Sequence, residues 1–152
     1  INEAPSSNKD LSKSDDKIFS VLSMLNPKMN KKKNILLINA CLWISYSDKA
    51  NLKLEMENIE GFCDPSILPE ILEESKFSKN KTNWYKKNFL AMLKSMDKLS
   101  LSEKSDILDK VCTIAMADGI LQKKELIVIE KISSILGFTK NYVDSVIKKL
   151  IK

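Results

Sequence analysis

The stretch 114–130 reads IAMADGILQKKELIVIE, and it decides the fold because a related stretch lies 70 residues earlier. That earlier stretch, 44–60, reads ISYSDKANLKLEMENIE. Six residues are identical at this offset, and in the second copy they are Ile114, Asp118, Lys123, Glu125, Ile129 and Glu130. In both copies one helical pattern ends, a polar turn follows, and a second helical pattern begins. The repeat therefore predicts two helix-turn-helix hairpins in one chain.

Helical periodicity continues outward from both hairpins. Apolar residues recur at steps of three and four along most of the chain after residue 10. The expected helices cover 11–26, 31–46, 52–60, 64–72, 85–96 and 102–115, with a polar loop at 76–83. The next expected helix holds Leu126, Ile129, Ile132 and Ile135 and ends at Gly137, and the last covers 139–151. Pro27, Gly61, Asp118-Gly119 and Gly137 are expected to end helices, and Ser102 to cap the start of one.

Composition supports an all-α protein. Three glycines and four prolines among 152 residues are too few to punctuate the many short strands of a sandwich or barrel. We expect a compact bundle of seven to eight helices built from two helix-turn-helix pseudo-repeats. Residues 11–152 form one domain on this prediction, and residues 1–10 form a flexible N-terminal tail or linker.

The residue inventory limits the chemistry of any site. All 25 basic residues are lysine, and histidine is absent. Catalytic triads that use histidine, Cys-His proteases, zinc sites rich in histidine and bidentate arginine contacts to guanine are therefore excluded. Carboxylate, amide, hydroxyl, thiol and lysine groups remain, and they single out no nucleophile or base. We therefore expect a protein that is not an enzyme.

Cysteine usage and hydropathy predict the compartment. Cys41, Cys63 and Cys112 are odd in number and lack the CxxC spacing of zinc or redox sites, so we expect buried, reduced thiols. The most apolar stretch, 35–44, is shorter than the roughly 18 to 20 residues that span a bilayer. A cytoplasmic protein is the expectation.

Each hairpin carries an Asp in its turn and a Glu seven residues later, namely Asp48 with Glu55 and Asp118 with Glu125. This spacing can bring two carboxylates together across the turn, where backbone carbonyls add oxygen ligands. Like charges at short distance need a cation or a shared proton. Oxygen ligands alone favour Ca²⁺ or Mg²⁺, or else Mn²⁺, over zinc. If the hairpins pack face to face, all four residues converge on one acidic pocket.

A purely structural interpretation explains the same residues. Asp118-Gly119 is a common turn pair, and the helix dipole favours an acid such as Glu125 in the first helical turn. On this interpretation the acidic residues stabilise the hairpins and bind nothing. The alternating oxygen ligands of an EF-hand loop are absent from the sequence.

The second hairpin resembles a known family. The residues that carry the resemblance are Ala115-Met116-Ala117-Asp118-Gly119, then Glu125, Ile129, Ile132 and Gly137-Phe138. They are similar to the TerB family of tellurite-resistance-associated proteins, which includes the TerB-like domain of membrane-tethered DnaJ proteins, and the resemblance spans 18–151. It implies an all-helical domain of two such hairpins and a stress protein, cytoplasmic or peripheral to the inner membrane, whose acidic residues bind a divalent cation. In the first hairpin Ser47-Asp48-Lys49 replaces Ala-Asp-Gly.

The positive charge of the chain is concentrated between Lys76 and Lys98. Seven lysines and one acid lie there, a net charge of +6 against +5 for the whole chain. Its lysines, among them Lys79, Lys81, Lys86 and Lys87, are interleaved with Trp84 and Tyr85. Such a patch can bind nucleic acid or an anionic membrane surface. Alternatively, the lysines form a solvated face while the two aromatic residues pack into the bundle.

Two functional hypotheses follow. The first is a non-enzymatic TerB-like domain of a stress-response system, which binds Ca²⁺, Mg²⁺ or a protein partner through the acidic hairpins and acts in a membrane-associated assembly. The second is a basic helical module that binds nucleic acid or anionic membrane through the Lys76–Lys98 segment.

Overall fold

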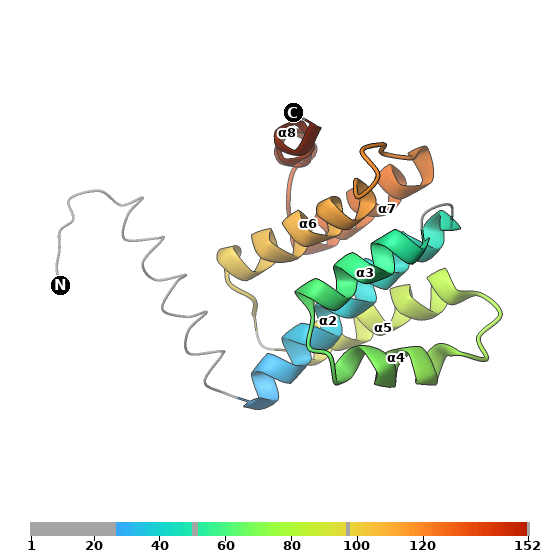
Figure 1. Ribbon diagram of the computed structural model, residues 1–152. Helices are drawn as coiled ribbons and strands as arrows, with labels where there is room; N and C mark the ends of the chain where they lie inside the picture. Colours follow the sequence, from blue (N-terminus) through green and yellow to red (C-terminus); the bar gives the residue numbers. More distant parts are fainter. Residues whose placement is uncertain (1–26, 50–51, 97, 152) are drawn as a thin grey trace, which may run out of the picture.

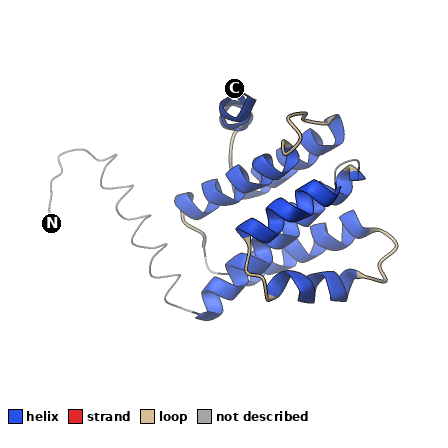
Figure 2. Ribbon diagram, in the orientation of Figure 1, coloured by secondary structure: helices blue, strands red, loops and turns tan. Residues whose placement is uncertain are grey.

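The computed structural model describes residues 27–49, 52–96 and 98–151, and every regular element in these ranges is a helix (Figures 1 and 2). The helices are α2 (Pro27–Ser47), α3 (Leu52–Phe62), α4 (Ile67–Ser75), α5 (Lys81–Ser95), α6 (Leu101–Ala115), α7 (Lys123–Leu136) and α8 (Lys140–Ile151). The all-α prediction is confirmed. The predicted tail at 1–10 and the predicted helix at 11–26 lie outside the described residues.

Helix α2 is the centre of the bundle. Residues on all of its sides are buried, among them Leu36, Ile38, Cys41, Leu42 and Ile44, none of which has any exposed surface. Helices α3, α4, α5, α6 and α7 all pack against it (Figure 1). A helix that is apolar on most sides is stable only when neighbours cover it, which is why this sequence occupies the core.

The two repeated hairpins pack against each other. The first consists of α2 and α3, the second of α6 and α7, and α2 contacts both helices of the second hairpin. Helix α3 also contacts α6, while α8 closes the bundle on α6 and α7. This packing brings the start of α3 near the start of α7, because Glu55 and Glu125, in the first turns of these helices, interact with each other.

Two predicted helix bounds are wrong. Helix α2 begins at Pro27, four residues before its predicted start at 31, and the fixed φ of proline suits a first helical turn, where no NH partner is needed. The predicted helix that Pro27 was expected to end lies outside the described residues. Gly61 lies inside α3, which continues to Phe62. The packing of Ile59 and Phe62 onto the core outweighs the glycine's weak helix propensity of about 1 kcal/mol.

Helices α4 and α5 also begin at other residues than predicted. Helix α4 begins at Ile67, because Asp64 first forms a turn in which its Oδ1 accepts from the Ser66 NH at 2.8 Å. Helix α5 begins at Lys81, capped by Asn80, whose Oδ1 accepts from the Asn83 NH at 3.0 Å. The loop is therefore shorter than predicted.

Helix α6 is capped by Ser100 and not by Ser102. Ser100 Oγ accepts from the Glu103 NH at 3.1 Å, while Glu103 Oε1 accepts from the Ser100 NH at 2.9 Å. This reciprocal capping box satisfies two NH groups that otherwise lack partners at a helix start. At the end of α7, Gly137 adopts the expected left-handed conformation with φ 92°.

The three cysteines are free and buried, as predicted. Burial raises the pKa of the Cys63 thiol to about 11 and that of Cys112 to about 12. Thiols of this kind remain protonated at neutral pH and are poor nucleophiles and metal ligands. None of the helices in the described ranges combines the length and the hydropathy that a membrane span requires.

Candidate acidic site

The two repeated glutamates occupy equivalent buried positions. Glu55 lies in the first turn of α3 and Glu125 in the first turn of α7, and they are only 3% and 2% exposed. Glu125 Oε1 accepts from the Gln122 NH at 3.1 Å, which fixes this carboxylate at the helix start. Charged side chains are almost never this buried without a partner, so the pair needs a physical explanation.

The two carboxyl groups face each other and interact. Burial raises the pKa of Glu55 to about 8; the Ser45 hydroxyl opposes this rise, and Glu125 and the charge of Asp118 add to it. Burial also raises the pKa of Glu125, although the Gln122 NH and Glu55 oppose the rise. The two carboxyl groups therefore titrate as a pair, and their burial keeps a proton on the pair at neutral pH.

The two repeated aspartates lie at the rim of the same site. The negative charges of Asp48 and Asp118 both act on Glu125, and that of Asp118 also acts on Glu55. Asp48 is half-buried in the turn after α2, whereas Asp118 is exposed. Asp118 Oδ1 accepts from the Ile120 NH at 3.0 Å, so this residue also stabilises its turn, as the structural interpretation predicts.

The turns themselves differ between the hairpins. Gly119 adopts a left-handed conformation with φ 82°, whereas Lys49, its counterpart, does not. The Lys49 ammonium lies over the Tyr46 ring, 6.0 Å from its centroid. At Lys49 the first turn therefore lacks the left-handed conformation of Gly119, and the lysine ammonium lies against an aromatic ring of α2.

Two buried oxygens at the site have no hydrogen-bond partner among the described residues. They are Glu55 Oε1 and the hydroxyl of Ser45, which is completely buried in α2 and lies near the Glu55 carboxyl. An unsatisfied buried polar group costs roughly 1 to 3 kcal/mol. The sequence analysis did not single out Ser45, although a signal was present. Ser45 is a polar residue on the buried apolar face of α2, at the position where the second copy has Ala115.

The arrangement is not a preformed metal cage. Within residues 27–49, 52–96 and 98–151, no three acidic or thiol side chains lie close enough together to hold a metal ion. The donor set nevertheless suits a hard cation, because it offers carboxylate and hydroxyl oxygens in a buried place. A contrasting buried acid, Glu103, forms an ion pair with Lys33 at 2.9 Å. Neither Glu55 nor Glu125 has an ion pair of this kind among those of the described residues.

Comparison with known proteins identifies the family. A family model described as tellurite resistance protein TerB matches residues 63–146, which is more than half of the chain. The chain belongs to the TerB family. The search of curated proteins and the search of solved structures each found no match. The matched range contains Asp118 and Glu125 of this TerB protein, whereas Asp48 and Glu55 precede it.

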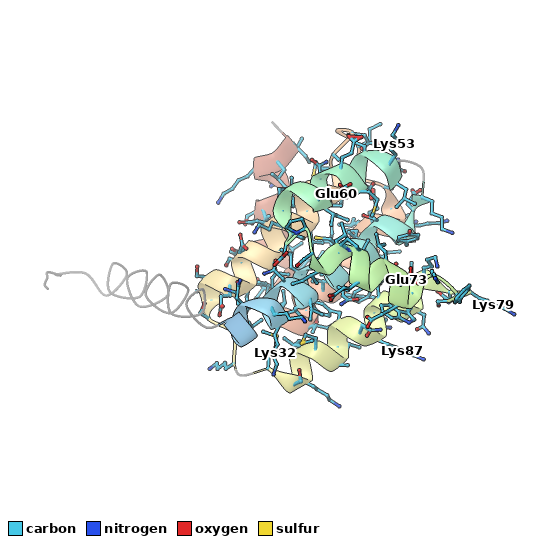
Figure 3. The ribbon with its side chains drawn as sticks, turned by 60° about the horizontal axis from the view of Figure 1, so that its bottom comes forward. Lys32, Lys53, Glu60, Glu73, Lys79 and Lys87 are labelled. Atoms are coloured by element: carbon cyan, nitrogen blue, oxygen red, sulfur yellow. The ribbon has the colours of Figure 1, made fainter. Side chains whose placement is uncertain are left out.

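The basic segment of the TerB protein is partly structural. Lys81 Nζ donates to the Ser75 carbonyl at 2.9 Å and to that of Lys76 at 3.2 Å, so this lysine stabilises the loop between α4 and α5. Lys79 and Lys87 are exposed and extend away from the ribbon, while Lys86 is half-buried (Figure 3).

The aromatic residues of that segment pack inward. Tyr85 is completely buried, and its ring meets that of Trp84 edge to face at a centroid distance of 5.4 Å. Trp84 is itself half-buried against the core. Base stacking requires exposed aromatic faces, so Tyr85 is not placed to stack on a nucleic acid.

Proposed function

We propose that this TerB domain is a non-enzymatic module that binds a divalent cation, Ca²⁺ or Mg²⁺, between Glu55 and Glu125. One observation carries the proposal: two buried carboxyl groups face each other, beside a buried hydroxyl and a carboxyl oxygen that both lack partners. A cation would offset the repulsion between the carboxylates and satisfy both oxygens at once. The negative charges of Asp48 and Asp118, at the rim, would add to the attraction of the site for the ion.

The proposed ion would link the two hairpins. Glu55 belongs to the first hairpin and Glu125 to the second, so an ion held by both ties α3 to α7. In its absence the carboxyl pair retains a proton at neutral pH, and a cation must displace that proton to bind. The ion would therefore cross-link the two hairpins, and the stability of this link would depend on cation concentration and on pH.

The biological setting is part of the same proposal. Membership of the TerB family supports a role in a stress response of the tellurite-resistance type. We propose that the domain acts in the cytoplasm, peripheral to the inner membrane, where the ion-bound bundle would bind a protein partner. We propose no catalytic residue, because the site offers oxygen ligands and no activated nucleophile.

Thermal unfolding of the full chain tests the proposal. Saturating Ca²⁺ or Mg²⁺ should raise the melting temperature above its value in EDTA, by roughly 5 °C if the ion concentration is about 100 times Kd. The Asp118→Asn, Glu125→Gln double variant should lose this rise, whereas Glu57→Gln, an exposed acid on α3, should keep it. If neither ion shifts the melting temperature of the wild-type chain, the proposal is wrong.

A further inference from the structure

A groove separate from the acidic site runs between α5 and α7, with α2 beneath it. It has a volume of about 490 Å³, and Trp43, Lys86, Ile127, Glu130, Lys131, Ser134 and Ile135 line it. Helix α2 contacts both α5 and α7, so Trp43 on α2 lies at the bottom while the other two helices form the walls. Trp43 is 4% exposed and packs its ring against Phe89 at a centroid distance of 6.0 Å.

The walls of the groove expose large apolar side chains. Ile127 is 45% exposed and Ile135 36%, and both lie on the outer face of α7. Leu90 on α5, which is 37% exposed, lines a neighbouring surface hollow and not this groove. Single exposed apolar residues need no explanation, but a group of them around a hollow marks a binding surface. Ile127 and Ile135 lie about 12 Å apart along the helix, the length of two helical turns.

Lysines surround this apolar surface. Helix α5 contains no acidic residue, and its Lys86, Lys87 and Lys94 stand beside the groove and the neighbouring exposed face. On the opposite wall α7 adds Lys131, and Glu130 is the one acid that lines the groove. A partner that fits this surface therefore needs an apolar stripe flanked by negative charge.

From this complementarity we infer that the groove binds an acidic amphipathic helix of a partner protein. Its apolar side chains would contact Ile127, Ile135 and the edge of Trp43, while its carboxylates would pair with Lys86 and Lys131. A helix suits the site because the two apolar anchors, Ile127 and Ile135, lie about two turns apart on α7, which matches the side-chain spacing of a helix bound in a groove. A membrane surface suits it less well, because the edge of Trp43 at the bottom of the groove is only 4% exposed and lies beyond the reach of a flat surface.

This inference is independent of the proposed cation site. Glu125 belongs to the buried face of α7, whereas Ile127 and Lys131 belong to its exposed face. Substitutions in the groove therefore leave the acidic pair in place. Failure of one proposal does not decide the other.

The test uses a synthetic 18-residue helical peptide with leucines at helical spacing and glutamates on both flanks. Its binding to the full chain is measured by fluorescence anisotropy, and isotope-labelled isoleucine methyl groups report the location by NMR. Binding should shift the methyl signals of Ile127 and Ile135. The Lys86→Glu, Lys131→Glu double variant and the Ile127→Ser variant should each weaken binding by about tenfold or more.

Matched controls keep the test specific. Lys148→Glu reverses an exposed charge on α8, and Leu150→Ser removes an apolar side chain of similar exposure, 41%, so neither should change peptide affinity. A peptide with lysines in place of the glutamates should not bind. The inference is overturned if the acidic peptide does not bind, or if the groove variants bind it as wild type does. It is also overturned if these variants weaken binding to phosphatidylserine vesicles, or self-association, without affecting peptide binding.

Discussion

Glu55 on α3 and Glu125 on α7 bury their carboxyl groups against each other at equivalent positions of two repeated hairpins. Each residue alone could be explained as an acid that favours the first turn of a helix. Burial of both at one place is not required for capping, because an exposed acid satisfies a helix start equally well. The pair is therefore the feature of this TerB domain that most needs a ligand or a proton to explain it.

In EDTA the stability of the domain should fall as pH rises from about 4.5 to about 8. Glu55 has a folded pKa of about 8 against an ordinary value of 4.5, so between these pH values the folded chain holds a proton that the unfolded chain has lost. One such proton changes the free energy of unfolding by at most about 1.4 kcal/mol per pH unit. Denaturant unfolding at a series of pH values measures this dependence. The Glu55→Gln variant should show a flatter dependence, and an unchanged slope would contradict the assignment.

Replacing Lys33, the positively charged member of the buried ion pair between α2 and α6, should destabilise the fold. Lys33→Met leaves Glu103, whose side chain is 3% exposed, without its partner at 2.9 Å, and we expect a loss of about 1 to 3 kcal/mol. Lys110→Met is the matched control, because its pair with Asp106 is also 2.9 Å long but exposed to solvent. The loss of stability in Lys110→Met should be less than about 1 kcal/mol. Urea unfolding compares the two variants, and equal losses would show that burial of the pair has no effect.

A buried hydrogen bond joins α4 to α5. The Tyr85 hydroxyl and Ser75 Oγ are 2.8 Å apart, and Ser75 Oγ is also 3.3 Å from the Leu72 carbonyl. Tyr85→Phe and Ser75→Ala should each cost about 1 kcal/mol. The double variant should cost less than the sum, because both single changes remove the same bond. Strict additivity in a double-mutant cycle would show that the two hydroxyls do not interact.

Two glycines should respond in opposite ways to replacement by alanine. Gly137 has φ 92°, so Gly137→Ala forces a side chain into the left-handed region at a cost of about 1 kcal/mol. Gly61 lies inside α3, and a Cβ there meets no atom within 4 Å, so Gly61→Ala should stabilise the fold by about 0.5 to 1 kcal/mol. Thermal unfolding distinguishes the two signs. Destabilisation by Gly61→Ala would contradict the placement of Gly61 inside the helix.

Most helices could be predicted from the sequence because helical periodicity and burial are directly linked. Their ends were less predictable, because proline suits both a helix start and the residue after a helix, as Pro27 shows. We expected Ser102 to cap α6, but Glu103 lies three residues after Ser100 and completes a capping box with that serine.

The sequence indicated which residues belong to the candidate site, but it did not indicate that two of them are buried. The internal repeat located all four acidic residues, because equivalent positions of two packed hairpins come near one another. The burial of Glu55 and Glu125, and the position of Ser45 beside them, depend on how α2, α3 and α7 pack. Such tertiary contacts leave no periodic signal in the sequence, so the pair could not be told from two solvated capping acids.

Calorimetric titration of the full chain with Ca²⁺, and separately with Mg²⁺, tests the central proposal most directly. We predict saturable binding of about one ion per chain by the wild type, with loss of binding in Glu55→Gln and in Glu125→Gln. The exposed-acid variant Glu57→Gln should bind as the wild type does. Absence of saturable binding by the wild type would contradict the account of Glu55 and Glu125 as a cation site. So would an affinity in Glu55→Gln and Glu125→Gln equal to that of the wild type.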